Sequence, residues 1–424
     1  MFDEFFLQYV WKYRLFDARG LTTVEGIPID ILEQGKENHL QGPDFLESKI
    51  KIGEQLWSGH VEIHVHSSEW FKHYHHFDAA YQNVILHVVW ENDKEAVQVN
   101  GSITHTLELR NRIFPFVLQN YTQLQKSKKS IACESGIKRL PEEIKINHLN
   151  KIGTKRLERK AEEIRKWIVE NEWNWELSFY QLLTKSMGTT GNSFAFKQLS
   201  EILPLKMLLN YRDNKLRTEA LLFGQSGLLE TINTFSGYRA ELLNEYEFLK
   251  HKYNLHPMNP AAWKFGKIRP AGFPTLRISQ LADLLCSKEH LFSRIMNCKT
   301  VKELQDLFYC RASLFWDNHY QFEGESKKYV KILGKAAIER LIINCALPMM
   351  FLFGKSRDRS ELVKRSYLLL EELPKEDNRI VKRFEKLGIR SKNALQSQGI
   401  LETKNYCEKR RCLKCDLGAW LLTN

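Results

Sequence analysis

The spacing of hydrophobic residues changes along the chain, and each change marks a different predicted structure. In residues 2–16 hydrophobic side chains recur every three or four positions, which predicts a helix. From about residue 24 to residue 99, short runs of β-branched and aromatic residues alternate with turn residues, as is typical of strands. The predicted strands are Ile27–Leu32, Phe45–Ile52, Gln55–His66, Asn83–Glu91 and Ala96–Val99. Because Asn83–Trp90 is nearly all apolar, we expect that strand to be central and buried on both faces.

The rest of the chain is predicted to be mainly helical. We expect a short helix or ordered loop at 68–82 and a helix at Ile113–Gln125. Helical periodicity then continues from about Glu143 to Gly388, with one proline-rich interruption at Leu255–Thr275. The sequence thus predicts an α+β protein in four parts. These are an α/β domain at 1–125, a polar linker at 126–142, a mainly helical domain at 143–395 and a short cysteine-rich tail at 396–424.

Composition fits a globular protein, with 43% hydrophobic and 27% charged residues. The longest apolar run, Leu341–Phe353, is too short to span a bilayer and contains Asn344 and Pro348. The N-terminus has no basic segment of the secretory type. We therefore expect a cytoplasmic protein with reduced cysteines and no membrane partner.

Charge is distributed unevenly. Residues 1–120 contain 10 Lys+Arg and 17 Asp+Glu, whereas residues 121–424 contain 53 Lys+Arg and 34 Asp+Glu, a balance of +19. A basic surface suits a polyanion such as nucleic acid, although many basic proteins bind none. Seven of the 14 histidines lie between His60 and His87, where carboxylates also gather. This density favours a metal site in the acidic part.

The segment GHVEIHVH at 59–66 arranges this chemistry on one predicted strand. Because side chains alternate along a strand, Glu62, His64 and His66 share one face, and Val61, Ile63 and Val65 share the other. Asp44, in the segment GPDF, opens the preceding strand and can supply a second carboxylate if the strand register allows it. The alternative is a solvated strand face with Asp44 as a turn residue. His73 is an outer candidate ligand, the rest of HYHHFD (73–78) fits a surface loop equally well, and His87 is expected to be a core histidine.

These motifs resemble the core of the PD-(D/E)XK nucleases over roughly residues 4–100. Pro43-Asp44 matches the Pro-Asp element, and Glu62-Ile63-His64 matches Glu-x-Lys with histidine replacing lysine. Glu4 is a weaker match to the accessory acidic residue of the first helix.

The resemblance implies a restriction-endonuclease-like domain with a mixed sheet that hydrolyses phosphodiesters in nucleic acid. Asp44 and Glu62 would hold Mg²⁺ or Mn²⁺, His64 would orient water or add a ligand, and His66 and His73 would be further ligands. Two alternatives stay open. One is a non-catalytic nucleic-acid-binding protein with a degenerate core, and the other is a zinc-type hydrolase of another substrate.

The whole chain also resembles a bacterial family known only as a domain of unknown function. The matching motifs are Gly42–Phe45, Glu62–His64, Trp70–His73, Leu86–Trp90 and the cysteine cluster Cys407–Cys415. This resemblance implies no activity.

The tail and the proline-rich loop carry two further candidate sites. Cys407, Cys412 and Cys415 lie within nine residues among basic side chains, which favours zinc or an iron–sulfur cluster over free thiols. A fourth ligand is needed, and Cys133, another cysteine or a histidine is available. In the loop, Lys264, Lys267 and Arg269 alternate with aromatic residues, so they can bind nucleic-acid phosphates or simply belong to a self-packed loop.

Overall fold

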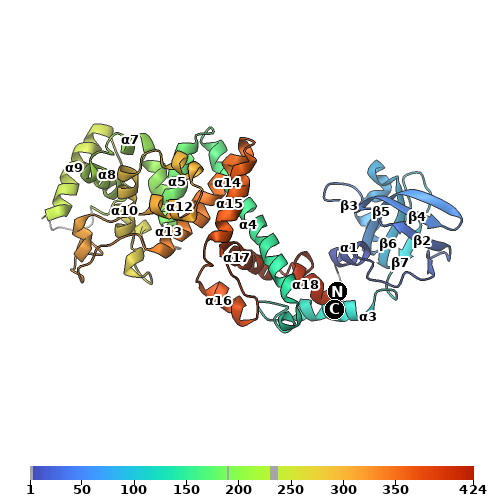
Figure 1. The fold of residues 1–424 in the computed structure, drawn as a ribbon. Helices are drawn as coiled ribbons and strands as arrows, with labels where there is room; N and C mark the ends of the chain where they lie inside the picture. Colours follow the sequence, from blue (N-terminus) through green and yellow to red (C-terminus); the bar gives the residue numbers. More distant parts are fainter. Residues whose placement is uncertain (1–2, 189–190, 230–236) are drawn as a thin grey trace. The chain divides into compact units, whose positions relative to one another are not determined.

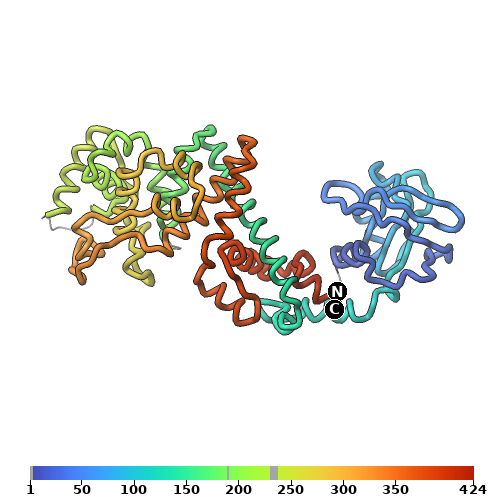
Figure 2. The backbone as a smooth tube through the Cα atoms, viewed as in Figure 1, coloured from blue at the N-terminus to red at the C-terminus, as the bar shows by residue number. Residues whose placement is uncertain are grey.

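The computed structural model describes residues 3–188, 191–229 and 237–424, and its chain divides into two compact units (Figures 1 and 2). The first unit comprises residues 1–148 and 403–424, and the second unit comprises residues 149–402. The cysteine-bearing end of the chain therefore belongs to the first unit. The stretch 126–142, which we expected to be a linker, lies inside that unit as well.

The first unit contains a mixed sheet, as the sequence predicted. Strands β1, β2, β4 and β5 are antiparallel neighbours in that order, whereas β5, β6 and β7 run parallel, and β3 pairs with β4. The bounds are β1 Leu21–Thr22, β2 Pro28–Glu33, β3 Lys36–Glu37, β4 Phe45–Ile52, β5 Gln55–His66, β6 Val84–Glu91 and β7 Thr106–Glu108. The expected strand Ala96–Val99 is reduced to one isolated bridge, between Val97 and Ile103.

Helix α1 (Glu4–Lys12) contributes to the main core of this unit. Asp3 caps its N-terminus by accepting a hydrogen bond from the Phe6 N–H at 2.9 Å. The buried residues Phe6, Leu7, Val10 and Trp11 of α1 belong to the same core as Val61 and Ile63 of β5, which confirms the predicted apolar face of that strand.

Helices α3 (Pro115–Lys126) and α18 (Asp416–Thr423) complete this core. Val117 and Tyr121 of α3 and Leu422 of α18 are buried in it. The two helices lie side by side, and Asn120 Nδ2 donates to the Leu422 carbonyl at 3.2 Å.

The segment 68–82 forms a second, smaller core in the same unit. It folds as α2 (Glu69–Lys72) and two 3-10 turns, η1 (His75–Phe77) and η2 (Ala79–Tyr81). Trp70 is fully buried and packs with Tyr81 of η2 and Val84 of β6. The expectation of a short helix or ordered loop is therefore correct.

The second unit is helical and has one large hydrophobic core. Helix α4 (Glu142–Glu170) begins in the first unit, and α17 (Ala394–Glu408) ends there. The helices between them are α5 Trp175–Met187, α6 Ser193–Ile202, α7 Leu205–Leu209, α8 Lys215–Gln225, α9 Gly237–Tyr253, α10 Pro274–Ser287, α11 Leu291–Asn297, α12 Val301–Phe308, α13 Lys335–Leu341, α14 Leu347–Ser356, α15 Ser360–Glu372 and α16 Arg379–Lys386.

One helical run, Lys335–Ser356, is long and apolar enough to cross a membrane by length and composition alone. It joins α13 and α14 through a π-helical turn at Ile342–Ala346, so it is longer than the apolar stretch visible in the sequence. In the structure 67% of the most apolar 18-residue stretch of this run is buried inside the protein. The run therefore serves as a core helix of the second unit.

Candidate metal centre

The polar side chains of β5 lie in the protein interior at the centre of the strand. Glu62 is 5% exposed and His64 is fully buried, as are Val61 and Ile63 on the opposite face. A solvated strand face is therefore the wrong interpretation for Glu62 and His64. A carboxylate buried in this way needs hydrogen bonds or a cation, because removal from water disfavours its charge.

Asp44, directly before β4, lies beside Glu62 of β5. Strand β4 pairs with β5 so that Phe45 is opposite Val61, which places Asp44 next to Glu62. The Asp44 N–H donates to Glu62 Oε2 at 3.0 Å, and the Ile63 N–H donates to Asp44 Oδ2 at 3.1 Å. These two hydrogen bonds fix both carboxyl groups at one end of the strand pair.

Helix α1 brings a third carboxyl group to the same place. Glu4 and Gln8 are four residues apart and so share one face of the helix. Gln8 Nε2 donates to Asp44 Oδ1 at 2.9 Å and to Glu4 Oε1 at 3.2 Å. Gln8 thus connects the helix carboxyl group to the strand carboxyl groups.

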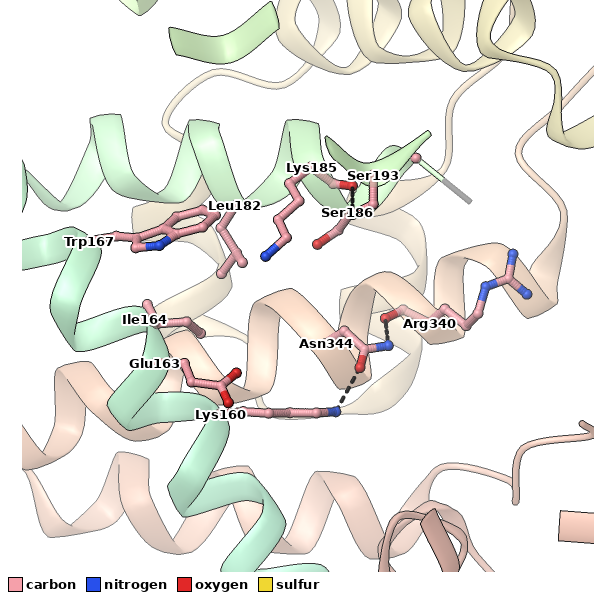
Figure 3. A pocket seen from close by; sticks show the side chains of 11 residues that line it. Lys160, Glu163, Ile164, Trp167, Leu182, Lys185, Ser186, Ser193, Arg340 and Asn344 are labelled. Atoms are coloured by element: carbon pink, nitrogen blue, oxygen red, sulfur yellow. Dashed lines mark hydrogen bonds between the residues drawn. The ribbon is translucent and has the colours of Figure 1, made fainter. Parts of the chain in front are cut away.

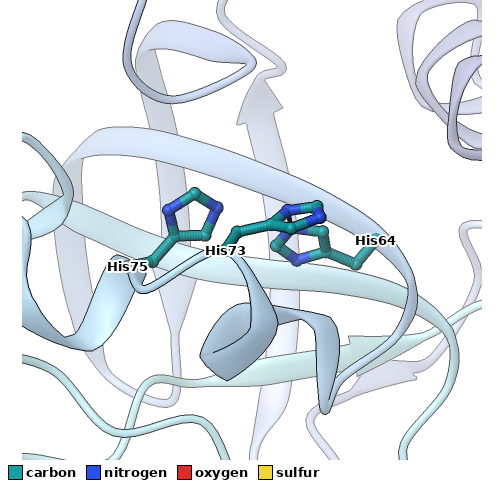
Figure 4. A group of neighbouring side chains, drawn as sticks. All are labelled: His64, His73 and His75. Atoms are coloured by element: carbon teal, nitrogen blue, oxygen red, sulfur yellow. Dashed lines mark hydrogen bonds between the residues drawn. The ribbon is translucent and has the colours of Figure 1, made fainter.

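Three histidines, His64, His73 and His75, lie next to one another (Figure 4), and two of them contact Glu62. One ligand nitrogen from each of His64, His73 and His75 lies within 4.8 Å of the other two. His64 Nε2 is 3.1 Å from His73 Nδ1, and Glu62 Oε1 lies 3.3 Å from His75 Nε2 and 3.6 Å from His64 Nε2. The nitrogens and the carboxylate oxygen therefore converge on one point.

The exposure of these residues suits a bound ion that solvent can reach. His75 Nε2 is buried and makes no hydrogen bond, and its near neighbour is Glu62 Oε1 at 3.3 Å, so a potential ligand atom faces a carboxylate of the group. His73 is exposed, whereas His64 and His75 are buried. The donor set fits a divalent transition metal, because imidazole and carboxylate together favour zinc or manganese.

The three carboxyl groups disfavour one another's charge. Burial, opposed by the hydrogen bond from the Asp44 N–H and aided by the charge of Glu4, raises the pKa of Glu62 to about 8. Burial and the charge of Glu62 raise the pKa of Asp44 to about 7, and burial and the charge of Asp44 raise that of Glu4 to about 7. A divalent cation between these groups would relieve this repulsion.

The buried histidines are neutral over the physiological pH range. Burial, together with the charges of His87, His75 and His73, lowers the pKa of His64 to about 2. Burial also lowers the pKa of His87 to about 3 and depresses that of His75. A neutral imidazole keeps a lone pair available for a metal.

A contact with His87 orients the imidazole ring of His64. Its Nε2 lies 2.8 Å from His64 Nδ1, and the parallel register places it beside Glu62. With Nδ1 held in this way, Nε2 of His64 faces Glu62 and His73. The expected core histidine thus has a supporting role for the site, of the kind that fixes the ring of a metal ligand.

His66 is the strand residue that the structure does not bring into this group. It is half-buried near the end of β5, and its backbone N–H donates to Glu69 Oε2 at 3.0 Å. His66 as a ligand stays a prediction. The sequence left open whether His75 belongs to a surface loop or to the site, and the structure places it beside Glu62.

The three cysteines of the tail belong to the first unit, and each lies at the end of a different helical element. Cys407 is near the end of α17, Cys412 begins a 3-10 turn, and Cys415 directly precedes α18. Cys415 Sγ is 3.8 Å from His148 Nε2. None of the eight cysteines forms a disulfide.

The predicted nucleic-acid-binding residues line one cavity of about 800 Å³ in the second unit. Lys264, Lys267 and Arg269 are joined there by Arg277, Lys335 and Arg340. Among the residues that the structure describes, the cavity lining contains no acidic residue. Six basic side chains without a carboxylate make a cavity that favours anions.

Arg277 is a buried basic residue of this lining. It is 6% exposed, and its Nη1 donates to Gln280 Oε1 at 3.1 Å, while its Nε has no hydrogen-bond partner. Burial and the charge of Arg340 lower its pKa to about 10. In the sequence Arg277 belongs to the same basic and aromatic stretch as the three loop residues, and the structure places it in α10.

A second cavity, of about 630 Å³, also has Arg340 in its lining (Figure 3). Lys185 Nζ lies 4.7 Å from the ring centre of Trp167, and Lys160 donates to Asn344 Oδ1 at 2.6 Å. Burial and the charge of Arg156 lower the pKa of Lys160 to about 7. Glu163 is the acidic residue in the lining, so this cavity is less purely cationic than the first.

Comparison with known proteins places the chain in a family. Residues 4–379 match the model of the family described as protein of unknown function (DUF2851), and the chain belongs to that family. The search of curated proteins and the search of solved structures gave no match.

Proposed function

We propose that this DUF2851 protein is a metal-dependent phosphodiester hydrolase that acts on nucleic acid. The observation that carries the proposal is the convergence of Asp44 and Glu62, from neighbouring strands, with the three-histidine group His64, His73 and His75. Two carboxylates around a divalent cation are the usual minimum for hydrolysis of a phosphodiester.

The arrangement supports a PD-(D/E)XK-like domain. Asp44 directly precedes β4, Glu62 lies on its antiparallel neighbour β5, β6 follows as a buried parallel strand, and Glu4 approaches the two carboxyl groups from the first helix. His64 replaces the lysine of that motif and is neutral, so it cannot supply a permanent positive charge. The positive charge near the phosphate would therefore have to come from the ion.

The residues that would hold the ion are Asp44, Glu62, His64, His73 and His75. Bound there, a divalent cation would supply Lewis-acid stabilisation of the phosphate and a more acidic water. Neutral imidazoles favour Mn²⁺ or Zn²⁺ over Mg²⁺, which prefers oxygen ligands.

The chain's own groups would position water and move its proton. Glu4 is linked to Asp44 through Gln8 and can accept a proton from water beside the carboxylates. His73 is exposed, so the site opens to solvent on that side, where water can carry the proton away. Trp70 and Tyr81 pack against His75 and bury that side of the site.

The basic cavity of the second unit supports a polyanionic substrate. Its loop residues Lys264, Lys267 and Arg269 would bind backbone phosphates, independently of base sequence. The excess of 19 positive charges in residues 121–424 acts in the same direction by attracting nucleic acid at long range.

Cleavage assays on the full chain test the proposal. Labelled single- and double-stranded DNA and RNA would be incubated with Mn²⁺, Mg²⁺ or Zn²⁺. Glu62→Gln should lower the rate of metal-dependent cleavage by at least about 100-fold, because it removes the negative charge of a ligand. Glu54→Gln makes the same chemical change at a fully exposed side chain of the β4–β5 turn and should leave the rate unchanged.

The same assay separates the substrate-binding role from the chemistry. A triple variant, Lys264→Ala with Lys267→Ala and Arg269→Ala, should raise KM and leave kcat nearly unchanged. No cleavage of any of these substrates by the wild-type protein, with any of the three ions, would refute the hydrolase proposal. Binding of nucleic acid without cleavage would point to a degenerate core.

A second candidate is a zinc-type hydrolase of another substrate. The observation that favours it is the three-histidine group itself, because three neutral histidines with an open fourth position are a common catalytic zinc set. One equivalent of zinc that copurifies and is lost in His75→Ala, with no phosphodiesterase activity, would favour this candidate.

A further inference from the structure

Four cysteines belong to the first unit, one of them far in sequence from the other three, and none of them is a residue of the proposed hydrolase site. They are Cys133, Cys407, Cys412 and Cys415, where Cys133 and Cys415 are buried and the other two are half-buried. Cys133 is separated by more than 270 positions from the three cysteines of the tail. The proximity of these four side chains is therefore a property of the fold.

The packing of α18 explains how Cys133 comes near the tail. Cys133 lies in a turn closed by the hydrogen bond from the Gly136 N–H to its carbonyl at 2.9 Å. A Cβ at Gly136 would lie 2.9 Å from Leu421 Cδ2, so the turn packs closely on α18. Cys415 directly precedes that helix.

The tail cysteines are held together by a tight turn. The Cys415 N–H donates to the Cys412 carbonyl at 3.2 Å, and the Arg410 N–H donates to that of Cys407 at 3.1 Å. A Cβ at Gly418 would lie 2.4 Å from the Cys412 carbonyl oxygen, so only glycine fits there. Arg410 has a left-handed backbone, with φ 53°, which bends the chain between Cys407 and Cys412.

Electrostatics support the same grouping. Burial raises the pKa of the Cys133 thiol, and the charges of Cys415, Cys407 and Cys412 raise it further. The charge of Arg410 has a lowering effect on the pKa of Cys407 and Cys412. Its Nη1 is buried without a hydrogen-bond partner. Burial nevertheless leaves the pKa of Cys407 and Cys412 above its usual value, so a bound metal would have to displace the thiol protons.

We propose that Cys133, Cys407, Cys412 and Cys415 together ligate one metal centre that fastens the end of the chain to the first unit. Four thiolates complete the ligand set of either a structural zinc ion or an iron–sulfur cluster. The proposal is independent of the hydrolase site, since it shares no residue with it.

The spacing of the sulfurs favours the cluster. Over residues 3–188, 191–229 and 237–424, the group with three or more ligand atoms mutually within 4.8 Å is the histidine group, and no cysteine trio meets that limit. A tetrahedral zinc ion holds its thiolates about 3.8 Å apart, given Zn–S bonds of about 2.3 Å. A polynuclear cluster places several metal ions and sulfides between its thiolates and accommodates wider spacing.

His148 is a supporting residue of this centre. Its Nδ1 is 2.9 Å from Asp416 Oδ2, and its Nε2 is 2.9 Å from Thr403 Oγ1 and 3.8 Å from Cys415 Sγ. Because both ring nitrogens already have oxygen partners, the ring orients Cys415 and leaves the fourth ligand position to Cys133.

Metal analysis of the full chain, purified without oxygen, tests the proposal. Iron with an equal amount of acid-labile sulfide and absorption near 400 nm would identify a cluster, while one zinc ion per chain would identify the single-ion form of the same four-thiolate centre. Cys133→Ser and Cys412→Ser should each lose most of the metal. Cys286→Ser, at a half-buried cysteine of the second unit, should retain it.

A measurement on the wild-type chain removes the dependence on variants that fold poorly. X-ray absorption at the metal edge should show a first shell of sulfur neighbours only. A chain without iron or zinc, a first shell of nitrogen and oxygen, or full metal content in a well-folded Cys133→Ser variant would overturn the proposal.

Discussion

At the scale of residues, the candidate metal centre rests on three histidines and on three carboxyl groups with raised pKa values. Asp44 and Glu62 could be predicted from the sequence, because alternation along β5 and the preceding Pro-Asp turn place them near the same strand end. His75 and Gln8 could not be predicted with confidence. Each reaches the site through a turn or helix face whose position depends on packing between distant segments.

The first prediction concerns the pH dependence of stability in the metal-free protein. Folding raises the pKa of Glu62 from 4.5 to about 8 and that of Asp44 from 3.8 to about 7. The folded state then binds more protons than the unfolded state, so these groups lose their stabilising effect as pH rises through 7 and 8. His64 has the opposite sign, since its pKa falls from 6.5 to about 2, and its penalty appears only below about pH 6.5.

We therefore expect the Tm of the chelator-treated chain to fall between pH 6.5 and pH 8.5. Differential scanning calorimetry measures this directly, and Glu62→Gln should flatten the decrease because it carries no titrating group. Adding Mn²⁺ at pH 8 should restore the Tm. A Tm that stays constant or rises over this interval in the wild-type chain would show that folding does not raise the pKa of these carboxyl groups.

At the scale of elements, the long strands and helices were predictable, and the short ones were not. Strands β4 and β5 have their predicted bounds because eight and twelve residues carry a clear alternation. Strands β1, β3 and β7 contain two or three residues and hold no period to detect. Their pairing depends on neighbouring strands, and the same neighbours leave Ala96–Val99 as a single bridge.

The second prediction concerns the contact between α4 and α17 in the second unit, where glycines allow close approach. A Cβ at Gly153 would lie 2.3 Å from the Leu395 carbonyl oxygen, and one at Gly399 would lie 2.2 Å from that of Leu149. Because both obstacles are backbone atoms, Gly153→Ala should destabilise the second unit by about 1–3 kcal/mol. Gly334→Ala is the matched control, since nothing lies within 4 Å of its added Cβ.

Chemical denaturation followed by circular dichroism measures both variants. A Gly153→Ala chain as stable as the control would mean that the two helices can separate at no cost. That result would contradict the close contact.

At the scale of the whole molecule, the second unit is an insertion within the first. Residues 1–148 and 403–424 form one compact unit, and residues 149–402 form the other. The sequence showed the change from strands to helices and the acidic-to-basic change in charge. It could not show that the tail returns, because the contact between Gly136 and Leu421 spans 285 positions and leaves no local pattern. The two proposed metal sites therefore both belong to the unit that contains the two ends of the chain.

The account depends above all on a divalent ion bound between Asp44, Glu62 and the three-histidine group. Its most direct test is an anomalous difference map at the manganese edge, from crystals of the full chain grown with Mn²⁺. The account predicts one strong peak, about 2.0–2.3 Å from carboxylate oxygens of Asp44 and Glu62 and from at least one nitrogen of His64, His73 or His75. A well-ordered site with no peak, or a peak at other residues only, would contradict it.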